Sequence, residues 1–126
     1  MDEENLAQLE VPRYFKAVYI PDDKFMLIGG LERHTSASSA RCFTIDERGR
    51  ILRLQDMDIG RQYFTICLDE PKNNLEKKTY VYVISGFNHE YSLLTEVERY
   101  CVETSSWEIM EENKTARLNA SACKCG

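Results

Sequence analysis

The chain has 126 residues, the length of one ordinary domain, of which 43% are hydrophobic and 29% are charged. This composition is typical of a soluble globular protein and excludes collagen-like, disordered and membrane-embedded chains. The 16 basic and 21 acidic residues give a net charge of −5, which argues against a nucleic acid as the partner.

Residues 1–11 are predicted to form an acidic N-terminal tail, because the first ten contain several acidic residues and no basic one. A secretion signal would instead be basic and then apolar. No apolar run approaches the roughly 18–20 residues of a membrane span, so no membrane association is expected. Five cysteines, an odd number without a secretion signal, favour reduced thiols and a cytoplasmic location.

Runs rich in β-branched and aromatic residues, bounded by turn-forming residues, predict strands along most of the chain. In chain order they cover residues 14–20, 25–28, 42–45, 51–54, 63–68, 80–84, 97–102, 107–110 and 118–123. Short strands at close and regular spacing predict an all-β fold.

An internal repeat divides this series of strands into units. Gly30 precedes Arg61 by 31 residues, and Gly86 precedes Arg117 by the same distance. Arg13 is interpreted as the arginine that opens the first unit. The predicted units are residues 12–61 and 62–117, followed by residues 118–126 as the opening strand of a third, truncated unit.

Each unit has an apolar strand ending in small residues, then an aromatic residue and, in the second unit, a tryptophan. Phe43 is aligned with Tyr100, and Arg50 stands where the second unit has Trp107. The motif residues are Arg13, Gly29, Gly30, Phe43, Arg61, Ser85, Gly86, Tyr100, Trp107 and Arg117. This pattern resembles the kelch repeat of the galactose oxidase and kelch-type propellers. The resemblance implies two four-stranded antiparallel blades plus one extra strand, an incomplete β-propeller.

The motif residues are all expected to be structural. The glycines should allow a positive φ at a tight turn, and Ser85 suggests that the first position of the pair needs only a small residue. The aromatic residues should pack between blades. In such repeats, the arginine is expected to satisfy carbonyl groups of the adjacent blade.

Known catalytic motifs are missing from the sequence: it has no phosphate-binding glycine loop, no His-Glu-x-x-His pair and no nucleophile elbow. His34 and His89 both follow a glycine pair and are interpreted as loop residues rather than metal ligands. Cys123 and Cys125 lack the second pair that a zinc site needs. We therefore expect no enzyme activity, no metal and no cofactor.

The resemblance implies that a protein or peptide binds the loops after each glycine pair, residues 31–40 and 87–94. The candidate contact residues are Phe15, Arg33, His34, Tyr63, Asn88, His89 and Asn119. The expected function is a non-catalytic interaction module, either a scaffold or the substrate-receptor part of a larger assembly such as a ubiquitin-ligase adaptor. The alternative is a fragment of a propeller-based enzyme similar to galactose oxidase.

Two units are too few for a closed ring, which usually has four to eight blades. We therefore expect the chain to be a fragment or a truncated product. The alternative is that several copies associate to complete one ring.

Overall fold

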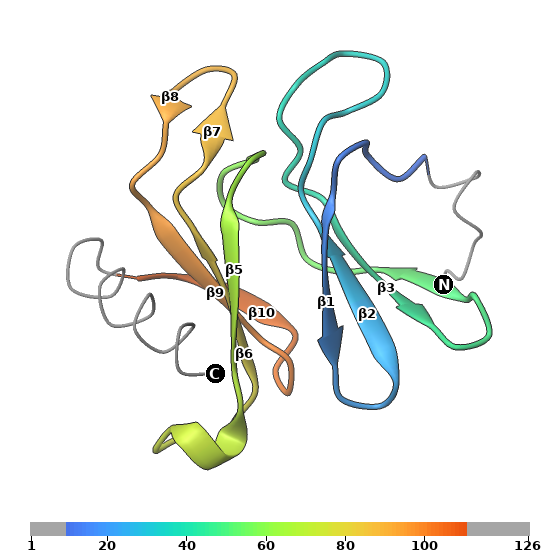
Figure 1. Ribbon diagram of the computed structural model, residues 1–126, viewed down its shortest axis with the longest axis vertical. Helices are drawn as coiled ribbons and strands as arrows, with labels where there is room; N and C mark the ends of the chain where they lie inside the picture. Colours follow the sequence, from blue (N-terminus) through green and yellow to red (C-terminus); the bar gives the residue numbers. More distant parts are fainter. Residues whose placement is uncertain (1–9, 111–126) are drawn as a thin grey trace.

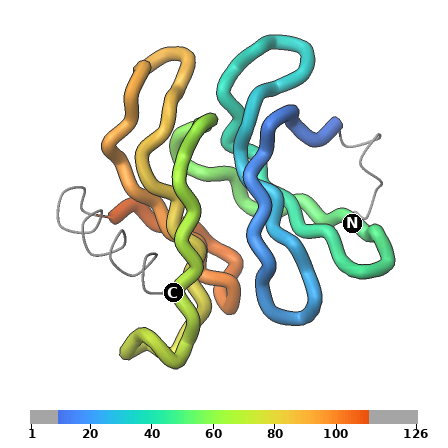
Figure 2. Tube along the Cα trace, in the orientation of Figure 1, coloured from blue at the N-terminus to red at the C-terminus, as the bar shows by residue number. Residues whose placement is uncertain are grey.

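The computed structural model describes residues 10–110, which form an all-β fold (Figures 1 and 2). Two four-stranded antiparallel sheets stand side by side, and within this range neither closes into a barrel. The expected fold class, antiparallel four-stranded blades of an incomplete propeller, is confirmed by this arrangement. The predicted strand 118–123 lies outside the described residues.

Each sheet is an antiparallel meander, in the orders β1-β2-β3-β4 and β10-β9-β6-β5, and in the second sheet the β7–β8 hairpin is inserted between β6 and β9. The first sheet comprises β1 (Lys16–Ile20), β2 (Lys24–Ile28), β3 (Cys42–Asp46) and β4 (Ile51–Arg53). The second comprises β5 (Thr65–Asp69), β6 (Tyr80–Ile84), β9 (Val97–Cys101) and β10 (Ser106–Met110). All eight strands begin and end within two residues of the predicted runs.

Local sequence explains these elements. All five residues of β6 are buried, as expected for an inner strand with packing on both faces. The β1–β2 connection contains Asp22 and Asp23 at positive φ, a conformation that aspartate tolerates better than most residues.

The main hydrophobic core lies between the two sheets. The first sheet and its trailing segment contribute Ile20, Met26, Ile28, Cys42 and Met57, and the second unit contributes Phe64, Val81, Val83 and Tyr100. The opposite face of the first sheet carries a smaller cluster, and so does the opposite face of the second. Apolar packing between the sheets therefore helps to join the two units.

The hydrogen-bond register corrects the assignment of Arg13. In the first unit the residue after Gly30 bridges to Arg13, whereas in the second the residue after Gly86 bridges to Gln62. Arg13 therefore corresponds to Gln62. The counterpart of Arg61 is the proline before Arg13, which is buried, while Arg13 itself is exposed.

The register also shifts the aromatic position of the first unit. Phe43 pairs with Leu27, the second-last residue of β2. Glu98 pairs with Val83, the second-last residue of β6. Phe43 is thus the counterpart of Glu98, and the counterpart of Tyr100 is Ile45. Phe43 packs with Val11 on the face of the first sheet that points away from the second.

Trp107 has an apolar counterpart as well. It pairs with Tyr100, and at the equivalent place Ile51 pairs with Ile45, so Ile51 rather than Arg50 occupies the tryptophan position. The Tyr100 and Trp107 rings lie 5.2 Å apart, and the indole donates a 2.9 Å hydrogen bond to the carbonyl of Gln55. The aromatic pair therefore contacts the segment that follows the first sheet.

The small-residue pairs share one backbone conformation. Gly29 and Ser85 have φ values of 63° and 62°, and Gly30 and Gly86 have values of 106° and 105°. The expectation that Ser85 needs only to be small is therefore corrected, because its position also demands a left-handed backbone.

Three further features were not anticipated. Residues 87–94, expected as a loop, contain a hairpin of β7 (Phe87–Asn88) and β8 (Ser92–Leu93). The polar stretch after β5 holds a short 3-10 helix, η1 (Pro71–Asn73). Cys67 is disulfide-bonded whereas Cys42 and Cys101 are free, which corrects the expectation of uniformly reduced thiols. No helix among residues 10–110 has the length and apolar character needed to cross a bilayer.

Candidate binding face

The two predicted binding loops lie at the same end of the molecule. Residues 31–40 and the β7–β8 hairpin project from neighbouring sheets (Figure 1), and hydrogen bonds join them. The Ser38 amide donates to His89 Nδ1 at 2.9 Å, and the His89 amide donates to Ser38 Oγ at 3.0 Å. The Gln62 side chain donates to the same hydroxyl at 3.1 Å. Together these contacts make one continuous face, which we call the loop face.

A buried ion pair stabilises the base of the loop face. Arg61 and Glu98 are both fully buried, with Nη2 and Oε2 2.7 Å apart. Arg61 Nη1 also donates to the carbonyls of Ser85 and Glu96, each at 3.0 Å. Glu98 accepts hydrogen bonds from the amides of residues 58–59. These hydrogen bonds and the ion pair hold the segment that connects the two sheets against the second sheet.

Two of the predicted contact residues, Asn88 and His89, are engaged within the molecule. Asn88 is buried, and its amide group donates to the carbonyl of Gly60 at 2.6 Å and accepts from the amides of Glu90 and Tyr91. His89 Nδ1 accepts a hydrogen bond from the Ser38 amide, which requires that Nδ1 carries no proton and that Nε2 carries it. Both side chains hold the hairpin in place.

Arg33 and His34 lie on the exposed tip of loop 31–40 and contact residues 10–11, which lead into the first sheet. Arg33 Nε donates to the carbonyl of Val11 at 2.8 Å, and His34 Nε2 lies 2.8 Å from Glu10 Oε1. These side chains are exposed, so their remaining surface is available at the loop face.

The base of this loop holds a further ion pair, between Arg41 and Glu32. Burial alone would raise the pKa of Glu32, but hydrogen bonds from Arg41 and Ser39 and the charge of Arg41 bring it below its ordinary value. The ionised pair therefore helps to fix the loop above the first sheet.

A pair of equivalent tyrosines protrudes just before the first strand of each sheet, β1 and β5. Tyr14 and Tyr63 are 69% and 76% exposed, and both have positive φ, at 56° and 55°. The register that aligns Arg13 with Gln62 also aligns these two tyrosines. The predicted contact residue Phe15 instead corresponds to Phe64, and at 39% exposed it is less exposed than either tyrosine. Tyr14 thus replaces Phe15 as the residue equivalent to Tyr63.

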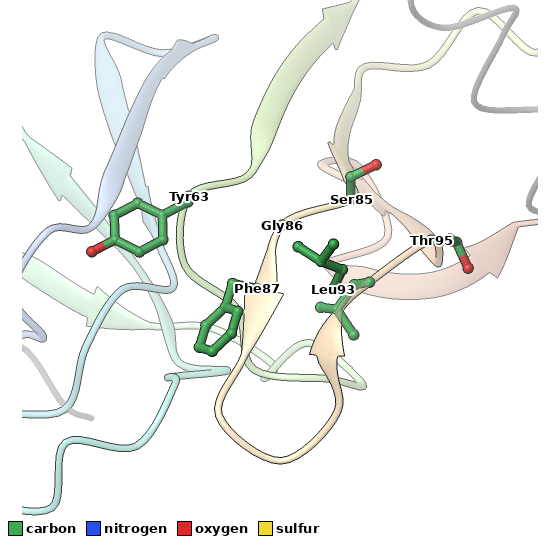
Figure 3. A pocket seen from close by; sticks show the side chains of 7 residues that line it. Tyr63, Ser85, Gly86, Phe87, Leu93 and Thr95 are labelled. Carbon is green, nitrogen blue, oxygen red and sulfur yellow. The ribbon is translucent and has the colours of Figure 1, made fainter.

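An apolar groove of about 610 Å³ opens beside Tyr63 (Figure 3). Its walls come from the end of β6 and from the hairpin, and its lining residues are Tyr63, Ser85, Gly86, Phe87, Leu93, Leu94 and Thr95. In Figure 3 the Tyr63 ring points away from the walls formed by Phe87 and Leu93. Tyr63 therefore borders the groove while its ring protrudes from the loop face.

Asn119, the remaining candidate contact residue, lies outside the described residues, as do Arg117, Cys123 and Cys125. Sequence reasoning missed Tyr14 and Glu98. The spacing in the sequence matches Phe15 with Tyr63. The backbone register instead matches the preceding residue, Tyr14, with Tyr63. Glu98 is two residues before Tyr100 on the same strand, so strand alternation alone would have placed it on the face toward the first sheet.

No protein-family model matches the chain, and no curated protein matches it. A solved structure, of a novel fungal alcohol oxidase of the AA5 family in complex with copper, matches with a TM-score of 0.60 and 11% sequence identity. The match covers 80% of this chain and 22% of the oxidase chain. At this identity the match shows a related, propeller-like β fold and does not show kelch repeats specifically.

This match corrects the expectation that the chain is not an enzyme, because it points to a fold that also occurs in an alcohol oxidase. The described residues do not by themselves fit a copper site. Among residues 10–110, no three His, Cys, Asp or Glu side chains come close enough to hold a metal ion. His34 contacts Glu10, and His89 contacts the Ser38 amide.

Proposed function

We propose that the chain is part of a propeller-type protein whose loop face binds a protein or peptide. The observation that carries this proposal is the repeated tyrosine, Tyr14 and Tyr63, exposed just before the first strand of each sheet, β1 and β5. A tyrosine supplies a large, rigid contact surface, and tyrosines are enriched among the residues that dominate binding energy.

Backbone strain supports the same proposal. A residue other than glycine in the left-handed region costs of order 1–3 kcal/mol, and such residues cluster at functional sites. Tyr14 and Tyr63 both adopt this conformation with their rings in solvent, where the rings gain little from packing. Binding of a partner would explain why the strained, exposed ring occurs in both units.

The charge of the loop face suggests the chemistry of the partner. Arg13 is exposed next to Tyr14, and Arg33 is exposed on the neighbouring loop. An arginine can form a bidentate pair with a carboxylate. A partner segment with acidic side chains beside an aromatic or apolar residue would therefore fit, as in a scaffold or a substrate receptor such as a ubiquitin-ligase adaptor.

The double substitution Tyr14→Ala and Tyr63→Ala tests the proposal. The tagged wild-type chain and the variant are used to recover partners from extracts of cells that produce the protein, with quantitative mass spectrometry. Loss of two such contacts at 1–2 kcal/mol each should lower recovery of the partner about tenfold or more. Tyr19→Ala is the matched control, because Tyr19 is 52% exposed at the opposite end of β1. Equal recovery by all three chains would refute the proposal.

The structural match supports a second candidate, a part of a propeller-based oxidase whose other segments supply the metal ligands. Copper analysis of the protein purified from its producing cells separates the two candidates. One copper ion per protein molecule would favour the oxidase.

A further inference from the structure

The connection between β5 and β6 is longer than a unit of this fold requires. The connection between the first two strands has three residues (21–23) in the first unit and ten (70–79) in the second, which we call the β5–β6 loop. This loop contains η1 and lies at the end of the molecule opposite the loop face, where Figure 1 draws it in yellow-green. Neither the repeat nor the loop face accounts for the seven additional residues.

One side chain closes the β5–β6 loop into a fixed shape. The side-chain amide of Asn74 donates to the carbonyl of Glu70 at 3.0 Å and to the carbonyl of Lys78 at 2.8 Å. Its oxygen accepts from the backbone amide of Lys78 at 3.1 Å. The Glu103 carboxylate then binds the amide of Thr79 at 2.8 Å and its hydroxyl at 3.0 Å. The two ends of the loop are therefore joined, and its base is fastened to the connection between β9 and β10.

The closed loop holds a leucine in solvent. Leu75 is 97% exposed, the highest value among the large hydrophobic residues in the part of the chain that the structure describes. It directly follows Asn74, so the side chain that closes the loop also fixes its position in the backbone. A group that is already held in place loses less conformational entropy on binding. The loop therefore presents a preorganised apolar side chain at the surface.

The charges around this leucine leave two lysines unpaired. Glu70 Oε1 lies 3.7 Å from Lys72 Nζ. Glu76 Oε2 lies 3.9 Å from Arg99 Nη2, so both glutamates of the loop have a basic partner. Among residues 10–110, the two lysines that follow Glu76 form no ion pair, and the first of them is exposed. The surface next to the leucine therefore complements an acidic group on a partner.

We propose that the β5–β6 loop is a second protein-binding site. Leu75 enters an apolar pocket of the partner, and Lys77 pairs with an acidic side chain on the rim of that pocket. The site is independent of the loop face, because it lies at the other end of the molecule. A protein pocket fits better than a lipid bilayer, since one leucine and two lysines provide too little apolar area and charge for stable membrane attachment.

Photo-cross-linking in the cells that naturally produce the protein identifies the partner. The variant Leu75→p-benzoyl-phenylalanine is irradiated, and the same substitution at Leu52, a partly exposed leucine of β4, is the control. The protein captured at position 75 and not at position 52 is purified, and its dissociation constant (Kd) for the full 126-residue chain is measured by isothermal titration calorimetry. Capture of no protein specific to position 75 would overturn the proposal.

Variants of the full chain decide whether the captured protein binds as proposed. Leu75→Ser should raise Kd at least about tenfold, because burial of a leucine side chain changes an affinity by that factor or more. Lys77→Glu should raise Kd about threefold or more, since it places a like charge opposite the acidic rim. Leu52→Ser is the matched control and should leave Kd unchanged. An unchanged Kd in Leu75→Ser, or an equal rise in Leu52→Ser, would overturn the proposal.

A further pair of variants tests the need for a closed loop. Asn74→Ala removes the three hydrogen bonds that close the loop and leaves Leu75 and Lys77 in place, so Kd should rise about threefold or more. Asn73→Ala is its control, because Asn73 is exposed and its side chain closes nothing. Equal Kd values for these two variants would contradict the preorganisation on which the proposal rests.

Sedimentation with vesicles of phosphatidylcholine and phosphatidylserine examines the other kind of partner. The wild-type chain should remain in the supernatant. Sedimentation of the wild-type chain that is lost in Leu75→Ser would assign the loop to a membrane surface and overturn the proposal.

Discussion

Replacing Arg61 with alanine should weaken the fold more than any surface substitution. The guanidinium is fully buried and donates to Glu98 and to two backbone carbonyls. The variant Arg61→Ala leaves the Glu98 carboxylate buried with only the two backbone amides of residues 58–59 as donors. A buried charge without its counterion is costly because the protein interior solvates it poorly.

The expected loss is about 3–5 kcal/mol, the usual cost of removing one partner from a buried ion pair. This is a large share of the roughly 5–15 kcal/mol that stabilises an ordinary domain. Arg53→Ala is the matched control, because Arg53 pairs with Asp56 in solvent, with both side chains about half exposed. An exposed pair contributes about 0–1 kcal/mol.

Urea unfolding followed by tryptophan fluorescence measures the difference. Trp107 is the only tryptophan of the chain, and its indole bonds to Gln55 of the segment that follows the first sheet. Its emission therefore reports separation of the two units. A loss in Arg61→Ala within about 1 kcal/mol of that in Arg53→Ala would refute the reasoning.

Three other predictions concern packing, pH and thiol reactivity. Gly29→Ala should cost about 2 kcal/mol or more in a urea titration, since its Cβ would lie 2.7 Å from the carbonyl oxygen of Arg61. Gly49→Ala, whose Cβ would have no atom within 4 Å, should cost about 1 kcal/mol. Burial alone would raise the pKa of Glu103, but hydrogen bonds from Thr79 bring it below 4.5. The ionised carboxylate of Glu103 therefore stabilises the fold above about pH 4.5, and this stabilisation is lost on acidification. The variant Glu103→Gln should accordingly show a smaller decline in Tm between about pH 6 and pH 3 than the wild-type chain. Burial raises the pKa of the Cys42 thiol, so iodoacetamide should modify Cys42 at least about tenfold more slowly in the native protein than in urea.

Each of these predictions has a clear contrary result. Equal losses in the two glycine variants would show that the close approach at Gly29 is not costly. An unchanged Tm profile in the Glu103 variant would show that this carboxylate does not contribute to the acid dependence. Rapid native-state modification of Cys42 would contradict its burial.

Strand positions were predictable because their residues carry strong local preferences. The runs that include Tyr80–Ile84 and Val97–Cys101 are apolar, β-branched or aromatic and end at turn formers. The β7–β8 hairpin was not predictable in the same way, since Phe87–Asn88 and Ser92–Leu93 are too short to show a period. Its shape depends on Asn88, whose side chain bonds to Gly60 in the connection between the sheets.

The candidate site was less accessible from sequence because it depends on register. From the sequence, Arg13 is matched with Arg61 because both are arginines that open a unit, whereas the backbone bridges align Arg13 with Gln62. That single-residue offset changes which aromatic residue, Phe15 or Tyr14, corresponds to Tyr63. Contacts between units, such as the bonds from Ser38 to His89, also join residues far apart in the sequence, which no local pattern reveals.

The most direct test of partner binding at the loop face places a photo-cross-linker at Tyr14, Tyr63 or Tyr19 in separate chains. Each chain is produced in its natural cells and irradiated, and the cross-linked proteins are identified. Tyr14 and Tyr63 lie at equivalent entries of the two units, and Tyr19 lies at the opposite end of β1. The account predicts that positions 14 and 63 capture the same partner and that position 19 does not. Capture of the same proteins at all three positions, or of no common partner at positions 14 and 63, would contradict it.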